Sequence, residues 1–176
     1  MEKDTGTILR LYPLGENGLI VCWCTAQHGI IRTAARNART PGSELAGRID
    51  LFHECELTFR PAKQGDLHTL CSATLISPRL ELRRHLTKLR LVSYMTRMVE
   101  ATVEAGTADP AWHTLISGAL DYVAQNTPRA AILHHFEKRM AELHGIHVPG
   151  LPPHPALLRH FQSLPAGRHE LLQELA

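Results

Sequence analysis

Long apolar stretches are the first feature that this sequence lacks. No run approaches the roughly 20 apolar residues that a helix needs to cross a bilayer. The N-terminal residues MEKDTGTILRLY mix both signs of charge, which argues against a secretory signal. We therefore expect a soluble, cytoplasmic protein. With 176 residues, 44% of them apolar, the chain is long enough for one or two domains with buried cores.

Sequence motifs of catalysis are also absent. Neither a GxGxxG nor a P-loop signature occurs, and no serine lies in a nucleophile-elbow sequence. The chain has four cysteines, none of them in a C-x-x-C pair: Cys22, Cys24, Cys55 and Cys71. We expect these to be small buried side chains on strands. The sequence therefore predicts a protein that is not an enzyme.

Histidines are plentiful, with twelve in the chain. Four of them lie around the proline-rich segment IHVPGLPPHP: His144, His147, His154 and His160. Histidines can ligate zinc, but a structural site of four histidines without a cysteine is unusual. We expect surface or helix-end side chains, and no metal or other cofactor.

Positive charge is concentrated in two zones, although the formal net charge is only +2. The segment from Gly29 to Arg48 holds four arginines against one acid, Glu44. These arginines are Arg32, Arg36, Arg39 and Arg48. The second zone, from Arg79 to Arg97, holds six basic residues against Glu81. Local clusters of this kind attract polyanions, although a solvated basic surface is the plain alternative.

The N-terminal part has the pattern of a small barrel. Turn residues separate five apolar segments, and the fourth alternates apolar and polar side chains. That alternation assigns Phe52, Glu54 and Glu56 to the wet face. The predicted strands are Thr7–Tyr12, Leu19–Thr25, Ile30–Arg36, Leu51–Arg60 and Leu67–Ile76.

The long connection Asn37–Ile49, with a helical turn at Ser43–Ile49, lies where an OB-fold carries a helix, and OB-folds commonly bind oligonucleotides. From the pattern alone, a Tudor-like or SH3-like barrel stays open. Tyr12, Trp23 and Phe52 are candidate stacking residues. Trp23 lies in the most apolar strand and is expected in the core, so Phe52 is the preferred candidate.

Helical periodicity begins after Ile76. Ser77-Pro78, Asp109-Pro110 and Thr127-Pro128 each place an N-cap residue before a first-turn proline, and Gly145 is a C-cap. Two short helices follow the proline-rich segment. We therefore predict an α+β chain with an OB-fold barrel at residues 1–77 and an all-α helical domain at residues 78–176.

Several motifs resemble one known family. LYPLGENGLIV, TAQHGI and AARNARTPGSELAGRIDLFHECEL resemble the N-terminal region of the RecO family of bacterial recombination-repair proteins. The matching positions are Gly15-Glu16, Thr25, His28-Gly29, Ala34–Arg39, Ser43–Leu45 and Leu51-Phe52. The segment Leu133–Leu151 resembles the helix end of the same family through Phe136-Glu137, Leu143, Gly145 and Pro149.

The resemblance implies an OB-fold followed by helices, and a cytoplasmic, nucleoid-associated recombination mediator. It implies binding of single- and double-stranded DNA, strand annealing, and RecA loading with a RecR partner on strands coated with single-strand-binding protein. It also implies contact with the acidic C-terminal tail of that protein. From charge alone, we assign this contact to four residues: Arg83, Arg84, Lys88 and Arg90.

The chain departs from the family in three ways. It lacks the four-cysteine zinc site that many members carry after the helix ending at Gly145, so no zinc is expected. It stops earlier than typical members, and Arg36-Asn37-Ala38 replaces a more usual Lys-Gly step. The alternatives to a DNA-binding mediator are a protein-interaction adaptor with weak or no DNA binding, and an OB-fold RNA binder. Arg32, Arg36, Arg39 and Arg48, with Phe52, are the predicted DNA contacts.

Overall fold

The computed structural model describes residues 1–176, and contacts divide the chain into two compact units. The first unit contains Met1–Pro78 and Val103–Ser117, and the second contains Arg79–Thr102 and Gly118–Ala176. The division into domains at residue 77 stays a prediction. What the structure adds is that residues 103–117 pack with the barrel.

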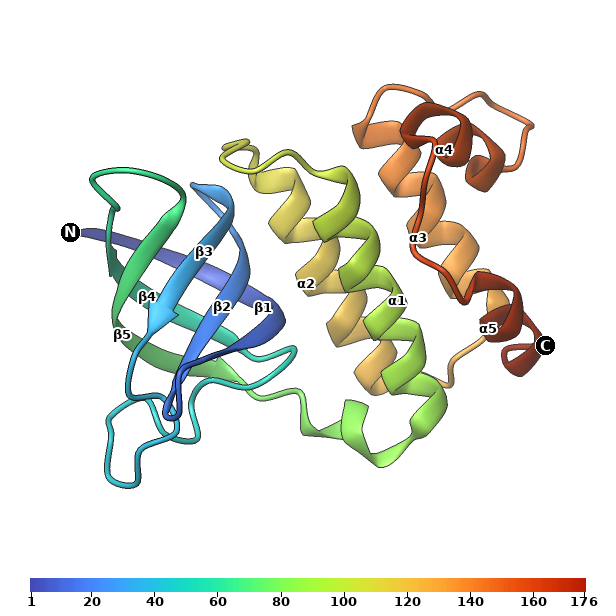
Figure 1. Ribbon diagram of the computed structural model, residues 1–176. Coiled ribbons are helices and arrows are strands. Elements are labelled where there is room, and N and C mark those ends of the chain that lie inside the picture. Colours follow the sequence, from blue (N-terminus) through green and yellow to red (C-terminus); the bar gives the residue numbers. More distant parts are fainter. The chain divides into compact units, whose positions relative to one another are not determined.

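Five strands form a closed barrel in the first unit (Figure 1). Their bounds are β1 Glu2–Leu14, β2 Gly18–Thr25, β3 Gly29–Ala35, β4 Glu54–Arg60 and β5 Leu67–Ser77. The spatial order is β1-β2-β3-β5-β4, and β4 pairs back to β1. All pairs are antiparallel except β3 with β5. The predicted OB-fold barrel is confirmed.

Alternate side chains of these strands fill the barrel. Val21, Trp23, Ile31, Leu57 and Phe59 are among its buried residues. The indole Nε1–H of Trp23 donates to Thr33 Oγ1 at 2.9 Å, which satisfies the one polar atom of the ring. Trp23 is therefore a core residue, as its apolar strand predicts.

Two sequence expectations about single strand residues are wrong. Cys71 is exposed, whereas the other three cysteines are buried. The side chain of Glu54 is only 14% exposed, because Ser117 Oγ donates to its Oε2 at 3.1 Å and His113 lies 3.4 Å from its Oε1. Glu56 does lie on the solvated face, where it pairs with Lys3 at 2.9 Å.

A short strap, residues 103–109, lies against the start of β3. Ala105 forms a bridge with Ile30, and the amide of Gly106 donates to the carbonyl of Ile30 at 3.1 Å. The strap passes so close to Gly29 that a Cβ there would lie 2.0 Å from the carbonyl oxygen of Thr107. Gly29 also has φ +67°, a conformation that favours glycine.

A buried carboxylate ties β1 to the β2–β3 turn. Asp4 Oδ2 accepts from the amides of Gln27 and His28 at 3.0 and 3.1 Å, and lies 2.6 Å from His28 Nδ1. Burial alone would raise the pKa of Asp4, but hydrogen bonds from His28, Gln27, Thr5 and Thr25 outweigh it, so the pKa is lowered. The turn is therefore held by an ionised aspartate.

The helical elements follow the predicted order. They are the 3₁₀ helix η1 Leu80–Arg84 and the helices α1 Leu86–Thr102, α2 Pro110–Gln125, α3 Ala130–Leu143, α4 Pro153–Phe161 and α5 Arg168–Glu174. Asp109 caps α2, since its Oδ1 accepts from the amide of Ala111 at 2.9 Å. The cap predicted at Thr127 is wrong, because α3 has Arg129 at its N-cap. No helix is both long enough and apolar enough to cross a membrane.

The second unit is held by a buried ion pair. Glu137 on α3 is fully buried and receives Arg168 Nε and Nη2 at 2.6 and 2.8 Å. His154 Nδ1 on α4 lies 3.3 Å from the same carboxylate. The side chain of Glu137 therefore connects α3 with both C-terminal helices.

Gly29→Ala should destabilise the first unit more than Gly42→Ala. Both glycines have positive φ, +67° and +80°, but nothing lies within 4 Å of a Cβ at position 42. The control should lose only the backbone term of about 1 kcal/mol, and Gly29→Ala about 2–4 kcal/mol, because the strap must also move. Urea unfolding measures both, and equal losses would contradict the close approach of the strap.

Asp4→Asn should lower the free energy of unfolding at pH 7 by about 1–3 kcal/mol, because the amide cannot accept all of these hydrogen bonds as an anion does. A lowered pKa stabilises the fold above the ordinary value of 3.8, and this contribution is lost as pH falls through the folded-state pKa. The gap between native chain and variant should therefore close below pH 4. The exposed Asp66→Asn is the control, and a gap that is independent of pH would contradict the assignment.

Candidate nucleic-acid interface

The outer face of β1, β2 and β3 gathers side chains from three strands. Arg10, Cys22 and Arg32 lie opposite one another across the strands, and Tyr12, Ile20 and Ala34 form the next row. Residues paired in this way share one side of a sheet. We call this surface the β1–β3 face and define it by Arg10, Tyr12, Ile20, Arg32 and Ala34. In OB-folds the face of strands 2 and 3 binds oligonucleotides.

Arg10 and Tyr12 hold each other on this face. The guanidinium carbon of Arg10 lies 5.7 Å from the centre of the Tyr12 ring, and Arg10 Nη1 donates to the Tyr12 hydroxyl at 3.1 Å. Both side chains are partly exposed. The contact combines a cation–π interaction with a hydrogen bond and so restricts the rotamers of both residues.

Arg36 and Arg39 lie at the end of the barrel that carries the β1–β2 turn. Both are exposed. The amide of Arg39 donates to the carbonyl of Asn17 in that turn at 3.0 Å, and Arg36 follows Ala34 by two residues, just after the end of β3. The β1–β2 loop is also a ligand-binding element of OB-folds. The structure thus brings two of the four predicted arginines to the edge of the β1–β3 face.

The other two predicted arginines have intramolecular partners. Arg32 Nη1 lies 3.6 Å from Asp66 Oδ2, with half of the Arg32 side chain exposed. Such an exposed pair contributes at most about 1 kcal/mol, so a phosphate can replace the carboxylate. Arg48 Nη1 donates to the carbonyl of Ala73 on β5 at 3.1 Å. Arg48 is exposed, but its guanidinium already has a backbone acceptor.

Phe52 does not lie on the wet face of β4. It precedes that strand, has φ 68° and is only 4% exposed. Its amide donates to the carbonyl of Ile8 at 3.0 Å. A buried ring offers no face to a base, so the proposed interface omits Phe52. The predicted helical turn at Ser43–Ile49 is likewise a series of turns.

The second basic zone contains both exposed residues and a residue that is buried within the fold. Arg83 and Arg84 lie on η1 and are exposed, and Arg84 Nη1 pairs with Glu81 at 3.1 Å. Lys88 is only 8% exposed, and its ammonium donates to the carbonyl of Ala124 at 2.7 Å. Arg90 is exposed and pairs with Glu174. Lys88 therefore acts within the fold rather than on its surface.

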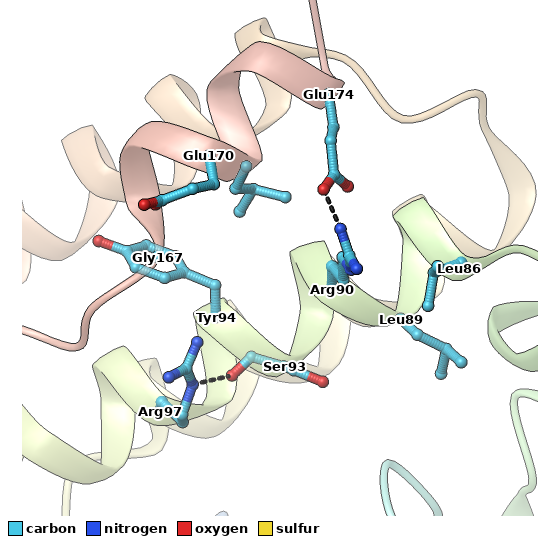
Figure 2. A pocket seen from close by; sticks show the side chains of 10 residues that line it. Leu86, Leu89, Arg90, Ser93, Tyr94, Arg97, Gly167, Glu170 and Glu174 are labelled. Carbon is cyan, nitrogen blue, oxygen red and sulfur yellow. Dashed lines mark hydrogen bonds and ion pairs between the residues drawn. The ribbon is translucent and has the colours of Figure 1, made fainter.

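A groove in the second unit lies between α1 and α5 and has a volume of about 420 Å³ (Figure 2). Two arginines, two glutamates and apolar side chains line it, among them Arg90, Arg97, Glu170, Glu174, Leu86 and Leu89. Tyr94 lines it too, and its buried hydroxyl has no hydrogen-bond partner. Burial, and then the charge of Glu137, raises the pKa of Tyr94 to about 12, so the hydroxyl stays a donor. We call this surface the α1–α5 groove.

The N-terminal residues of this chain are similar to a known protein family. Residues 1–79 match the family described as Recombination protein O N terminal. The DNA repair protein RecO of Cyanothece sp. is 36% identical over 97 residues, which cover 55% of this chain and 32% of that protein. Residues 1–79 of this chain are therefore similar to the N-terminal domain of the RecO family.

Two further relatives extend the similarity into the helices. The DNA repair protein RecO of Halalkalibacterium halodurans is 28% identical over 145 residues, which cover 82% of this chain and 56% of that protein. That of Chromobacterium violaceum is 27% identical over 180 residues, which cover 100% of this chain and 68% of that protein. The chain thus spans between a third and about two thirds of the length of these RecO proteins.

Sequence reasoning missed Arg10 and undervalued Tyr12. Their shared face could have been predicted, because the segment TILRLY alternates and places Arg10 and Tyr12 on the side opposite Leu11. What the sequence did not contain was the pairing partner of each position. The registers of β1 with β2 and of β2 with β3 place these separate residues on one surface of the barrel.

Proposed function

We propose that this chain is a DNA repair and recombination mediator that binds single- and double-stranded DNA without catalysing a covalent step. It anneals complementary strands and, with a RecR-like partner, assists RecA loading on strands coated with single-strand-binding protein. The observation that carries the proposal is the set of exposed arginines on and beside the β1–β3 face of an OB barrel.

Binding would depend mainly on phosphate contacts. Arg36 and Arg39 are exposed, and the backbone amide of Arg39 is hydrogen-bonded to Asn17 in the β1–β2 turn. Arg32 can exchange Asp66 for a phosphate, while Arg48 would add a contact from the neighbouring connection. Guanidinium contacts with phosphates are independent of base sequence and release counterions, so affinity falls steeply with salt. This is the behaviour that a mediator acting on any sequence requires.

The same charges provide a physical basis for annealing. Two complementary strands repel each other through their phosphates, and neutralising part of that charge lowers the barrier to their encounter. Contacts limited to the backbone leave the base edges free to pair. Annealing therefore needs no reaction chemistry from the protein.

Partner binding would use the helical unit. We assign the acidic C-terminal tail of single-strand-binding protein to the α1–α5 groove, where Arg90 and Arg97 flank apolar side chains. Arg83 and Arg84 remain proposed contacts, whereas Lys88 is left out because it is buried. The exposed Arg83 and Arg84 would steer an acidic segment toward the helical unit, whereas Glu170 and Glu174 balance the two arginines of the groove itself. The apolar lining of the groove would then hold the apolar side chains of the segment.

An adaptor that binds proteins but little DNA is the second candidate. Two observations favour it: the net charge is only +2, and both Arg32 and Arg48 already have acceptors within the chain. In that case the groove would be the main binding site. The two functions differ in whether the barrel binds an oligonucleotide at all.

Replacing Arg36 and Arg39 together by alanine should weaken binding to single-stranded DNA and lower its salt dependence. Each lost phosphate contact should reduce the slope of log affinity against log salt by about 0.7–1. Titration of a labelled oligonucleotide at several salt concentrations measures both quantities. Unchanged affinity and slope would show that this assignment is wrong.

Two controls separate the candidates. Arg139→Ala removes a half-exposed arginine from the helical unit, where it pairs with Glu142, and should leave DNA binding unchanged. A peptide with an acidic, Phe-terminated sequence tests the groove directly. Peptide binding without oligonucleotide binding at low salt would favour the adaptor.

A further inference from the structure

We propose that Tyr12, held in place by Arg10, is a base-stacking platform that makes the β1–β3 face prefer single-stranded over double-stranded DNA. This inference rests on the proposed function and names the substrate that one part of the site selects. The arginines beside the face bind either form, and the tyrosine adds affinity for only one of them.

The position of the ring supports this role. Tyr12 pairs with Ile20, which pairs with Ala34, so the ring begins an apolar row across three strands. Arg10 and Arg32 lie in the adjacent row, and Arg36 follows Ala34 by two residues. An apolar row flanked by cations matches a single strand, in which bases and phosphates lie side by side along the chain.

The ring is also preorganised. Arg10 Nη1 donates to its hydroxyl at 3.1 Å, and the guanidinium carbon lies 5.7 Å from the ring centre. The restraint limits the rotamer entropy that Tyr12 loses when a base stacks on it. Ile20 is partly exposed, so a planar base can approach the ring from the β2 side, whereas Ala34 on β3 is buried.

Selection follows from what each form of DNA exposes. In a duplex each base face is covered by the next base pair, so stacking on a protein ring first requires unstacking. A single strand presents its base faces at much lower cost, and stacking on an aromatic side chain tolerates any base. Phosphate contacts do not distinguish the two forms in this way.

The test compares single-stranded and double-stranded oligonucleotides of one sequence with the native chain, Tyr12→Ala and Tyr12→Phe. Tyr12→Ala should weaken single-strand binding by about 5- to 100-fold, and duplex binding less than about 2-fold. Tyr12→Phe keeps the ring and should keep most of the single-strand affinity. The salt slope should stay the same in Tyr12→Ala, because no phosphate contact is lost.

Tyr122→Ala is the matched control, since it removes a half-exposed tyrosine from the helical unit. Thermal unfolding verifies that each variant is folded. Equal losses on both forms of DNA, or no loss on either, would overturn this inference while leaving the proposed function intact. So would an equal loss in Tyr12→Phe. If the native chain bound neither oligonucleotide, the proposed function and this inference would both fail.

Discussion

Closure of the five-stranded barrel is the constraint on which the rest of this structure depends. β1 makes it possible, because its first half pairs with β4 and its second half with β2. The register shift between Ile8 and Arg10 follows Thr7, the last residue of β1 that pairs with β4, and a bulge of this kind bends the strand. Closure fixes the side of the sheet that is filled by Trp23 and Phe59. The opposite side of β1–β3 is then the only place where Arg10, Tyr12 and Arg32 can meet.

Local charge, rather than total charge, decides what this surface can bind. Most cations of the chain have a specific acceptor: Lys88 binds a helix carbonyl, Arg168 binds the buried Glu137, and Arg48 binds a strand carbonyl. Such contacts stabilise each unit but reduce the charge that is available to a ligand. The exposed Arg36 and Arg39, at the β1–β2 end of the barrel, are therefore worth more to a polyanion than the net charge of +2 suggests.

The fold could be predicted from the sequence to a greater extent than the site. Alternation and turn residues indicated the strands, and the Asp109-Pro110 start of α2 was correct, because both signals are local. The prediction that Phe52 lies on the solvated face was wrong because the alternating sequence pattern continues through a turn. A positive φ in that turn reverses the direction of the side chain. The predictions of a solvated Glu54 and a partner-binding Lys88 were wrong because the pattern of a strand or helix does not reveal which distant segment covers that element. The β1–β3 face required the register between strands, which no local pattern contains.

The most direct test of the central claim is amide hydrogen exchange of the whole chain with and without a saturating single-stranded oligonucleotide. The account predicts slower exchange in the β1–β2 turn, around Gly15 to Gly18, and in the connection from Arg36 to Arg48. Exchange in α3 and α4 should not change. Slowing confined to the helical unit, or no slowing in the barrel at saturation, would contradict the account.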